Sequence, residues 1–592
     1  MHRISKIKIE NYKSIVNAEF PLSAYTPLVG YNNAGKTNIL QALSWVIKKT
    51  SLPGTDFHDP ALPIVVTAKI SGIDADVLDA LEQSHRNRIE PLVVDGSISL
   101  RRTQAEPGIG VGGIRLEILQ IENNEEQWVI NPAGIDQAIN RMFPDPIFIG
   151  AMENATEDVA KFASGTTIGK LIKEIIGPVA ERNAGPVSDA LAQVASRLSA
   201  DGEEKDQALV DLDEQIDVEL SKFFPGVRAK IHIQTPEFAD FLKNATIKIY
   251  DQNYDHANGR DASSFGHGAQ RTVQIALIKC LSELKRAAGG HAARTTLLLI
   301  DEPELFLHPQ AIEIVRASLS RLSEEGYQIA FSTHSPNMIS RNDASNALLV
   351  RRSVEHGTTT FPRLSDAVLD AIAGADHQSE TLFTLTNSSK VLFCEKVILA
   401  EGKTERALLP EIYSFEHEAT MDENKLGLVE LGGADNVPNA MTVLRTMGIP
   451  TKAVVDLDFA FRGAVIHGLI EADHDSLEEC KLIFHRLANA GQIVLDDNTS
   501  LPQNGNGVTA AAAFELLAAE ADAQGHIDAI HNHLLENNVW CWKNGTIETH
   551  LGLESKKSAA HHAFLNQYQS EDYRDGLPDY PGVRALMDWL ND

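Results

Sequence analysis

The sequence predicts an α/β fold class, with a large N-terminal part followed by a smaller α/β part that has a parallel sheet. Three observations predict it. An apolar strand at 26–29 leads through a glycine loop into a helix, an apolar strand at 296–300 ends in two carboxylates, and a new strand-then-helix series opens at 391. Because parallel strands present their carboxyl ends at one edge of a sheet, polar motifs after such strands are expected to gather there.

Composition limits the class of protein. The 592 residues are enough for about three or four domains. Hydrophobic residues make up 43% and charged residues 23%, which excludes a disordered or fibrous chain. The formal net charge of −30 argues against a protein that coats nucleic acid through uniform positive charge. It leaves open a local, metal-dependent cleft, which would itself add carboxylates.

Neither a membrane span nor a secretory signal is expected. No run of about 18 apolar residues occurs, and residues 1–16 alternate apolar and polar side chains as a first strand does. The four cysteines form no CxxC pair and no zinc spacing, which fits a reduced, cytoplasmic setting. They are Cys280, Cys394, Cys480 and Cys541.

The remaining elements follow in order along the chain. A strand is expected at 25–29, a helix at 38–48 and a β-rich stretch at 60–150. Helical spacing with Gly-Pro punctuation then predicts an α-helical insertion, and a polar stretch around 375–390 predicts a linker. We therefore expect one domain in two parts, an insertion between them and a separate C-terminal domain, with the boundaries 1–165, 166–228, 229–385 and 390–592.

A complete phosphate-binding motif lies at residues 30–37. These residues match G-x-x-x-x-G-K-S/T, follow an apolar strand and open a helix, which is the context that the motif requires. The glycines let backbone N–H groups face the phosphates, and the helix N-terminus adds a fixed positive dipole. Lys36 is expected to neutralise phosphate charge and Thr37 to hold Mg²⁺. The candidate nucleotide-binding residues here are Gly30, Asn33, Gly35, Lys36, Thr37 and Asn38.

Two later strands carry the catalytic groups that such a site needs. The strand at 296–300 ends in Asp301, which is expected to bind Mg²⁺ through water, and in Glu302, which is expected to polarise the attacking water. Another strand, at 328–333, leads into His334, which is placed to contact a γ-phosphate.

In this order the motifs resemble those of the ABC-type ATPases of the SMC and DNA-repair group. In that family two heads sandwich ATP, and a signature loop of the second head completes the site. The resemblance gives this role to 263–271, with Ser264, Gly266 and Gly268 as nucleotide contacts, although the leucine of the usual LSGGQ is absent. A glycine-rich helix cap is the alternative for this segment. The insertion at 166–228 is too short for the long coiled coil of an SMC protein.

A second group of acids follows the strands after residue 391. Glu401 ends one strand and Glu405 lies one helical turn later, so both are expected to face one site. Asp456 and Asp458 follow another strand, and in an extended chain two carboxylates at this spacing point to the same side. Acids gathered at the edge of a parallel sheet suit Mg²⁺ or Mn²⁺.

This half of the chain resembles the Toprim domain of topoisomerases, primases and related nucleases, in which the glutamate and the D-x-D motif bind metal for phosphodiester chemistry. An ABC head followed by a Toprim domain resembles the layout of the Overcoming Lysogenization Defect (OLD) family over essentially the whole chain. The family implies a DNA endonuclease with two metals and a nucleotide-sensing head, in bacterial defence against phage. Its cofactors are ATP and Mg²⁺ or Mn²⁺.

The resemblance also assigns further residues to the nuclease site. Family members carry a late acid and a late lysine there, which corresponds to Glu548 as a metal ligand and to Lys556 or Lys557 as the group that stabilises the transition state. A solvated basic pair is the alternative for the two lysines. The resemblance implies one metal that activates water and a second that assists the leaving 3′-oxygen. The ligands of the first would be Glu401, Asp456 and Asp458, and those of the second Glu405 and Glu548.

The partners implied are DNA, further copies of the chain in a homodimer or dimer of dimers, and a helicase-like protein or a retron's reverse transcriptase with its DNA. The apolar helix faces of 166–228 also need a partner to bury against. Two alternatives stay open: a nuclease of the same architecture that cleaves RNA or tRNA, and an ABC ATPase clamp or sensor with an inert Toprim fold.

Overall fold

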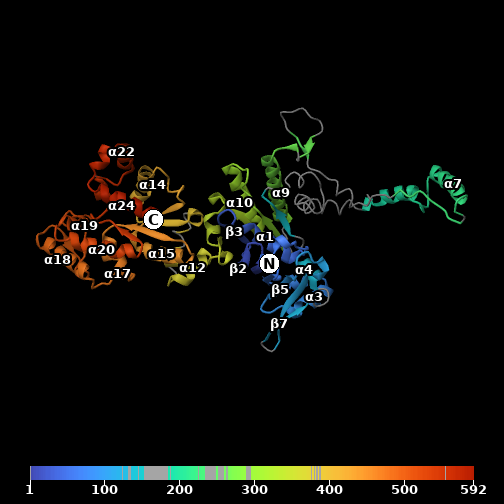
Figure 1. Cartoon of the computed structure of the whole chain (residues 1–592), viewed down its shortest axis with the longest axis horizontal. Coiled ribbons are helices and arrows are strands. Elements are labelled where there is room, and N and C mark those ends of the chain that lie inside the picture. The colour runs from blue at the N-terminus through green and yellow to red at the C-terminus, as the bar shows by residue number, and fades with distance from the viewer. Residues whose placement is uncertain are drawn as a thin grey trace. The chain divides into compact units, whose positions relative to one another are not determined.

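The computed structural model describes most of the chain, in two compact units (Figure 1). The N-terminal unit comprises residues 1–26 and 37–338, and the C-terminal unit comprises 27–36 and 339–592. The described residues are 2–122, 125–130, 135–143, 146–151, 185–186, 188–224, 226–233, 248–250, 259–261, 264–288, 295–374, 377–378, 381, 385, 389–553 and 555–592.

The first half of the N-terminal unit is an antiparallel sheet. Its strands are ordered β7-β6-β5-β4-β1-β2, and residues along β5 alternate between buried and partly exposed, as expected for a sheet with one face on the core. The β-rich stretch expected at 60–150 is therefore present. The bounds are β1 (Arg3–Tyr12), β2 (Ile15–Pro21), β4 (Ile64–Ser71), β5 (Ser97–Gln104), β6 (Arg115–Glu122) and β7 (Glu125–Ile130).

A parallel group of strands carries the polar motifs of this unit. Strand β11 (Thr296–Ile300) lies between β8 (Ile147–Ile149) and β12 (Tyr327–Thr333) and pairs in parallel with both. Every residue of β11 and β12 is buried, because α9 (His267–Ala288) and α10 (Pro309–Glu324) pack apolar side chains against them. The carboxyl ends of β11 and β12 therefore point their following residues to a common edge.

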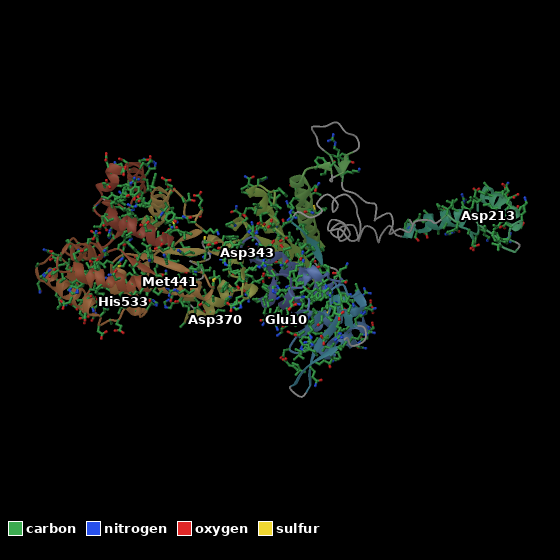
Figure 2. The ribbon with its side chains drawn as sticks, in the orientation of Figure 1. Glu10, Asp213, Asp343, Asp370, Met441 and His533 are labelled. Carbon is green, nitrogen blue, oxygen red and sulfur yellow. The ribbon has the colours of Figure 1, made fainter. Side chains whose placement is uncertain are left out.

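The expected insertion is described only in part. Residues 166–184, 187 and 225 lie outside the described residues, whereas 188–198 and α7 (Gln207–Ser221) are helical. Asp213 of α7, labelled in Figure 2, forms an ion pair with Lys205 and accepts a hydrogen bond from the Ile231 N–H at 2.8 Å. The described part of the insertion thus holds its own local structure.

The C-terminal unit contains the phosphate loop and a four-stranded parallel sheet. The loop follows β3 (Tyr25–Val29), which pairs in parallel with β13 (Leu348–Ser353). The parallel sheet has the order β16-β15-β17-β20. Its strands are β15 (Lys396–Ala400), β16 (Leu426–Glu430), β17 (Thr451–Val455) and β20 (Val539–Cys541).

Helices cover both faces of this parallel sheet, because successive strand residues point to opposite sides. Val397, Leu399 and Val455 pack into one core with α15, α18, α19 and α20, and Met441 of α15 is labelled in Figure 2. Ile398 packs into a second core with α14, α21, α22 and α24. The helices are α14 (Lys403–His417), α15 (Val437–Thr446), α18 (Asp475–Asn489), α19 (Ala510–Ala519), α20 (Gln524–Glu536), α21 (Ile547–Leu551), α22 (Ser558–Tyr568) and α24 (Tyr580–Asn591). Across the described residues, no helix has the length and apolar character that a bilayer span requires.

Candidate functional site

The Thr37 hydroxyl meets the Asp301 carboxylate in the N-terminal unit. Thr37 is the second residue of α1 (Lys36–Ile47), Asp301 follows β11, and Oγ1 of Thr37 donates to the two carboxylate oxygens at 3.0 and 2.9 Å. Ser332, buried in β12, also donates to Asp301. The two groups expected to share Mg²⁺ therefore lie together although 264 positions separate them. A threonine hydroxyl beside a strand-end aspartate fits the Mg²⁺ of a bound nucleotide.

Glu302 lies beside His334 and has a strained backbone conformation. Its φ is +47°, a left-handed value that costs a non-glycine residue about 1–3 kcal/mol. Its N–H donates to the Ser332 hydroxyl at 2.9 Å, and its Oε1 lies 3.4 Å from Nε2 of His334. The turn thus directs the Glu302 carboxylate to the edge where β12 also ends.

Arg271, the last residue of the candidate signature segment 263–271, supports this turn from α9, which begins inside that segment at His267. Its buried guanidinium donates to the carbonyls of Asp301 at 3.0 Å and Glu302 at 2.8 Å. Burial lowers the pKa of Arg271 to about 10, against the opposing effect of nearby carboxylates, so it stays charged at neutral pH. Sequence reasoning identified the polar and glycine residues before and at the start of α9 and missed Arg271. Its only signal is a basic residue one turn into the helix.

Glu304 is a second residue that sequence reasoning missed. Its Oε1 accepts hydrogen bonds from the Thr333 hydroxyl and from the His334 N–H, both at 2.8 Å. Its Oε2 is buried and makes no hydrogen bond. Glu304 therefore holds the backbone of His334, and its signal in the sequence is that it is the third acid of the D-E-P-E run.

The phosphate loop is packed tightly against β13. A Cβ atom at Gly30 would lie 2.3 Å from the carbonyl oxygen of Val350, so only glycine fits there. The Lys36 ammonium donates to the carbonyls of Gly30 and Tyr31, both at 2.9 Å. Asn33 has a left-handed φ of +64°. The loop is thereby closed on itself around the lysine that was expected to face phosphate.

Tyr31, inside the phosphate loop, connects that loop with the parallel sheet of the C-terminal unit. Its ring centroid lies 4.3 Å from the Arg351 guanidinium and 5.2 Å from the Lys425 ammonium. Lys425 forms an ion pair with Glu395, which directly precedes β15. Burial raises the pKa of the Tyr31 phenol to about 12. The two cations on this ring connect the loop directly with β13 and with the residue before β16, and through the ion pair with Glu395 they connect it with the start of β15.

The predicted acids gather at the carboxyl edge of the parallel sheet. Glu401 follows β15, Glu405 lies in the first turn of α14, and Asp456 follows β17. Oε2 of Glu401 accepts the Asp456 N–H at 3.1 Å. Adjacent parallel strands thus bring together residues that lie 55 positions apart in the chain.

Burial and neighbouring negative charges disfavour the ionised form of these acids and raise their pKa values. Burial, followed by the charges of Asp458 and Glu405, raises the pKa of Glu401 to about 7. Burial and then Glu401 hold the pKa of Asp456 well above its usual range. Burial also raises the pKa values of Glu405 and Asp458. Several buried carboxylates of one sign are stabilised by a cation among them.

Glu548 joins this group from α21. Its Oε1 accepts the Thr404 hydroxyl at 2.7 Å and lies 3.4 Å from the Lys556 ammonium. Burial alone would lower the pKa of Lys556, but Glu548 and Asp456 outweigh it and raise that pKa. Lys556 is thus the late lysine found among the acids, while Lys557 is the N-cap residue of α22. Thr404 was missed, because a buried threonine between two glutamates carries no distinctive sequence signal.

The prediction that the D-x-D segment is extended is wrong. Leu457 has helical angles (φ −62°, ψ −30°), and Asp458 is the first residue of a short helix, α16 (Asp458–Phe461). The chain turns here because β17 has reached the sheet edge, and a helix start favours an acid. Asp458 still acts on Glu401, whose pKa its charge raises.

The acids fit a divalent cation by one structural test. Oδ1 of Asp456 and Oε2 of Glu548 are buried and make no hydrogen bond, and such atoms need a partner. Within the described residues, no three acidic, histidine or cysteine side chains are close enough to ligate one ion as they stand. Small side-chain movements toward a bound ion are therefore part of the expected coordination.

Mg²⁺ is expected to stabilise the chain more at pH 8 than at pH 6. Folding raises the pKa of Glu401 from its ordinary 4.5 to about 7, so the folded state binds this proton more tightly than the unfolded state. The resulting stability is complete below pH 4.5 and is lost as the pH rises through about 7. At pH 8 Glu401 is mostly ionised and binds the cation with less competition from protons than at pH 6.

Calorimetric Tm values with and without Mg²⁺ at both pH values test this. Glu401→Gln is the matched variant and should show a smaller difference between the two Mg²⁺ shifts. Equal Mg²⁺ shifts of the wild type at pH 6 and pH 8 would contradict the assignment.

Two family models match this sequence. Residues 392–458 match the model described as "Overcoming lysogenization defect protein-like, TOPRIM domain", and 3–92 with 149–339 match an AAA ATPase domain. The Old nuclease of Escherichia phage P2 is 32% identical over 596 residues, covering 99% of this chain and 100% of its own length. The chain belongs to the OLD family.

A second relative in the OLD family is the OLD nuclease of Thermus scotoductus. It is 23% identical over 468 residues, which cover 77% of this chain and 82% of that protein. The OLD Toprim model includes Glu401, Glu405, Asp456 and Asp458 and ends before Glu548.

Solved structures of SMC heads also match this OLD family chain. The SMC head domain from Thermotoga maritima is 14% identical, with 61% of this chain and 98% of that chain covered and a TM-score of 0.27. An Smc head domain with an extended coiled coil, derived from Pyrococcus furiosus, is 16% identical, with 62% and 98% covered and a TM-score of 0.35.

Proposed function

We propose that the chain is a nucleotide-regulated, divalent-metal-dependent endonuclease that cleaves DNA, in defence of a bacterium against phage. The observation that carries the proposal is the group of buried and half-buried acids at the carboxyl edge of the parallel sheet, with two unpartnered oxygens and the Lys556 ammonium beside them. Membership of the OLD family, with a nuclease 32% identical over the whole chain, supports it.

The residues have separate tasks in the proposed reaction. Bound divalent cations supply water activation and neutralise charge on the scissile phosphate and the leaving 3′-oxygen. Glu401, Asp456 and Asp458 hold one ion, and Glu405 and Glu548 hold the other. Thr404 orients Glu548 through its 2.7 Å hydrogen bond. Lys556, whose raised pKa keeps it charged, balances the negative charge that develops on the phosphate.

Cleavage assays on the purified chain test this function. Supercoiled plasmid, linear DNA and RNA are incubated with Mg²⁺ or Mn²⁺ and with EDTA. Nicking of plasmid that EDTA abolishes supports the proposal. Cleavage of RNA alone would replace DNA by RNA as the substrate, and no cleavage of any substrate would favour an inert Toprim fold.

The head binds ATP with Mg²⁺ in the same proposal. Lys36 and the loop N–H groups take the phosphates, Thr37 and Asp301 take the ion, and Glu302 acts on the attacking water with His334 beside it. The segment containing Ser264, Gly266 and Gly268 contacts the nucleotide of a second head. A homodimer or dimer of dimers follows from that requirement, and mass photometry with and without ATP tests it.

Tyr31→Ala is expected to uncouple cleavage from nucleotide. The ring is the contact of the phosphate loop with Arg351 and with Lys425 of the Toprim region, so its removal should bring the ratio of plasmid cleavage rates with and without ATP close to one. ATP affinity is measured separately and should change little, because Lys36 and Thr37 remain.

Tyr31→Phe is the matched control for this variant. It keeps the ring between the two cations and removes only the phenol hydroxyl, so it should behave as the wild type. A wild-type ATP response in Tyr31→Ala would rule out this route of coupling.

A further inference from the structure

The loop between β20 and α21, residues 542–546, is held at two backbone positions. The Asn544 N–H donates to Nε2 of His550 at 2.9 Å, and the Gly545 carbonyl accepts the Leu457 N–H at 2.8 Å. Leu457 stands between the two aspartates of the D-x-D motif. The loop therefore joins that motif to the helix that carries Glu548, across about 90 positions of sequence.

Gly545 makes this close approach possible. Its φ of +101° is unfavourable for other residues, and an added Cβ would lie 2.8 Å from Cγ and 3.2 Å from Cα of Glu515. The loop is thus pressed against α19 on one side and bonded to the D-x-D turn on the other. Asn544, the residue before Gly545, is held by His550.

His550 is fixed from both sides of its ring. Its side chain is buried, and Nδ1 lies 2.5 Å from Oδ2 of Asp579. Because the Asn544 N–H occupies Nε2, that nitrogen is the acceptor and Nδ1 carries the proton that is donated to Asp579. Trp542 packs against the ring, with centroids 4.7 Å apart.

Asp579 is itself anchored by α24. Its Oδ1 accepts the Gly582 N–H at 3.0 Å as the N-cap of that helix, and its own N–H donates to the His550 carbonyl at 3.3 Å. A run of hydrogen bonds therefore connects the C-terminal helix, through Asp579 and His550, with the loop. No member of this run reaches the acids directly.

We propose that His550 and Asp579 are positioning residues of the nuclease site, which set the place of Glu548 relative to the D-x-D aspartates. The proposal rests on the proposed nuclease function. The charges of Glu548 and Glu405 each contribute to raising the pKa of Asp456, so these acids repel one another. A site of this kind holds its geometry only if its backbone supports are rigid. The pair supplies that support outside the group of acids.

Two replacements of His550 separate its two hydrogen bonds. His550→Gln places an amide oxygen near the Nε2 position and so keeps an acceptor for Asn544, whereas His550→Asn places an amide N–H near the Nδ1 position and keeps the bond to Asp579. His562→Gln, on an exposed face of α22, is the matched control. Each chain is compared with the wild type in Mn²⁺ binding, followed by electron paramagnetic resonance, in plasmid cleavage over a Mn²⁺ series, in ATP hydrolysis and in Tm.

His550→Asn is expected to raise the Mn²⁺ concentration needed for half-maximal binding and cleavage by about 10–100-fold, the usual cost of losing an outer support of a metal site. His550→Gln should recover most of that loss, and ATP hydrolysis should stay at the wild-type rate in both. Asp579→Asn keeps the helix cap, and the Mn²⁺ concentration that it needs should lie between those of His550→Gln and His550→Asn. His562→Gln should match the wild type.

Wild-type Mn²⁺ affinity in both His550→Asn and Asp579→Asn would overturn the proposal. Equal losses in His550→Gln and His550→Asn that follow their Tm values would overturn it as well, because they would show a role in stability only. If the wild-type chain binds Mn²⁺ and cleaves nothing, the proposed nuclease function fails, while the binding measurements still decide the positioning role.

Discussion

Asp456→Asn is expected to abolish plasmid cleavage while ATP binding and hydrolysis continue. Asp456 lies at the centre of the acidic group, with its N–H bonded to Glu401 and its Oδ1 without a partner. Losing a metal ligand removes several kcal/mol of transition-state stabilisation, which corresponds to about a 10³-fold loss of rate. The measurement is the rate of plasmid nicking in Mg²⁺ and in Mn²⁺.

The same variant should be folded at least as stably as the wild type in the absence of metal. Glu401, Glu405 and Glu548 each raise the pKa of Asp456, so a neutral side chain there relieves repulsion. Asp473→Asn, at an exposed position of the same unit, is the matched control and should cleave normally. Undiminished cleavage by Asp456→Asn would remove this residue from the metal site.

Glu302→Gln is expected to bind ATP and to hydrolyse it about 10²–10⁴-fold more slowly, the usual cost of losing a general base. The amide keeps the shape of the side chain, and the backbone stays held by Ser332 and Arg271. Retention of radiolabelled ATP together with phosphate release measures both properties. Glu324→Gln, exposed near the end of α10, serves as the control.

Comparison with Lys36→Ala then shows whether the head controls the nuclease. Lys36→Ala removes a charge that binds phosphate and should weaken ATP binding by about 10–100-fold. Glu302→Gln thus represents the ATP-bound state and Lys36→Ala represents the empty state. Equal plasmid cleavage by both variants and the wild type, at zero and millimolar ATP, would show that the two activities are independent.

Several of the groups that sequence reasoning found directly follow an apolar strand or a glycine loop. Asp301 and Glu401 are of this kind. Local sequence is enough for them because a parallel strand delivers whatever follows it to the sheet edge. Glu548 was found through the resemblance to the OLD family.

The residues that support the two sites through hydrogen bonds could not be predicted from the sequence, for a different reason. Thr404, Glu304 and Arg271 act through hydrogen bonds to residues that are between 29 and 144 positions away. Threonine, glutamate and arginine are common in helices and turns, so no local pattern distinguishes the few that make such bonds.

Residue type and short-range periodicity are enough to predict the order of the motifs, the strands they follow and the chemistry of the acids. Three features depend instead on the folded chain: the D-x-D segment bends into a helix, Lys556 lies at Glu548 while Lys557 is the N-cap of α22, and the ring of Tyr31 contacts Arg351 and Lys425. Each depends on where a side chain from a distant segment lies. The position of such a side chain is set by the packing of helices on both faces of a sheet, which the neighbouring residues in the sequence do not encode.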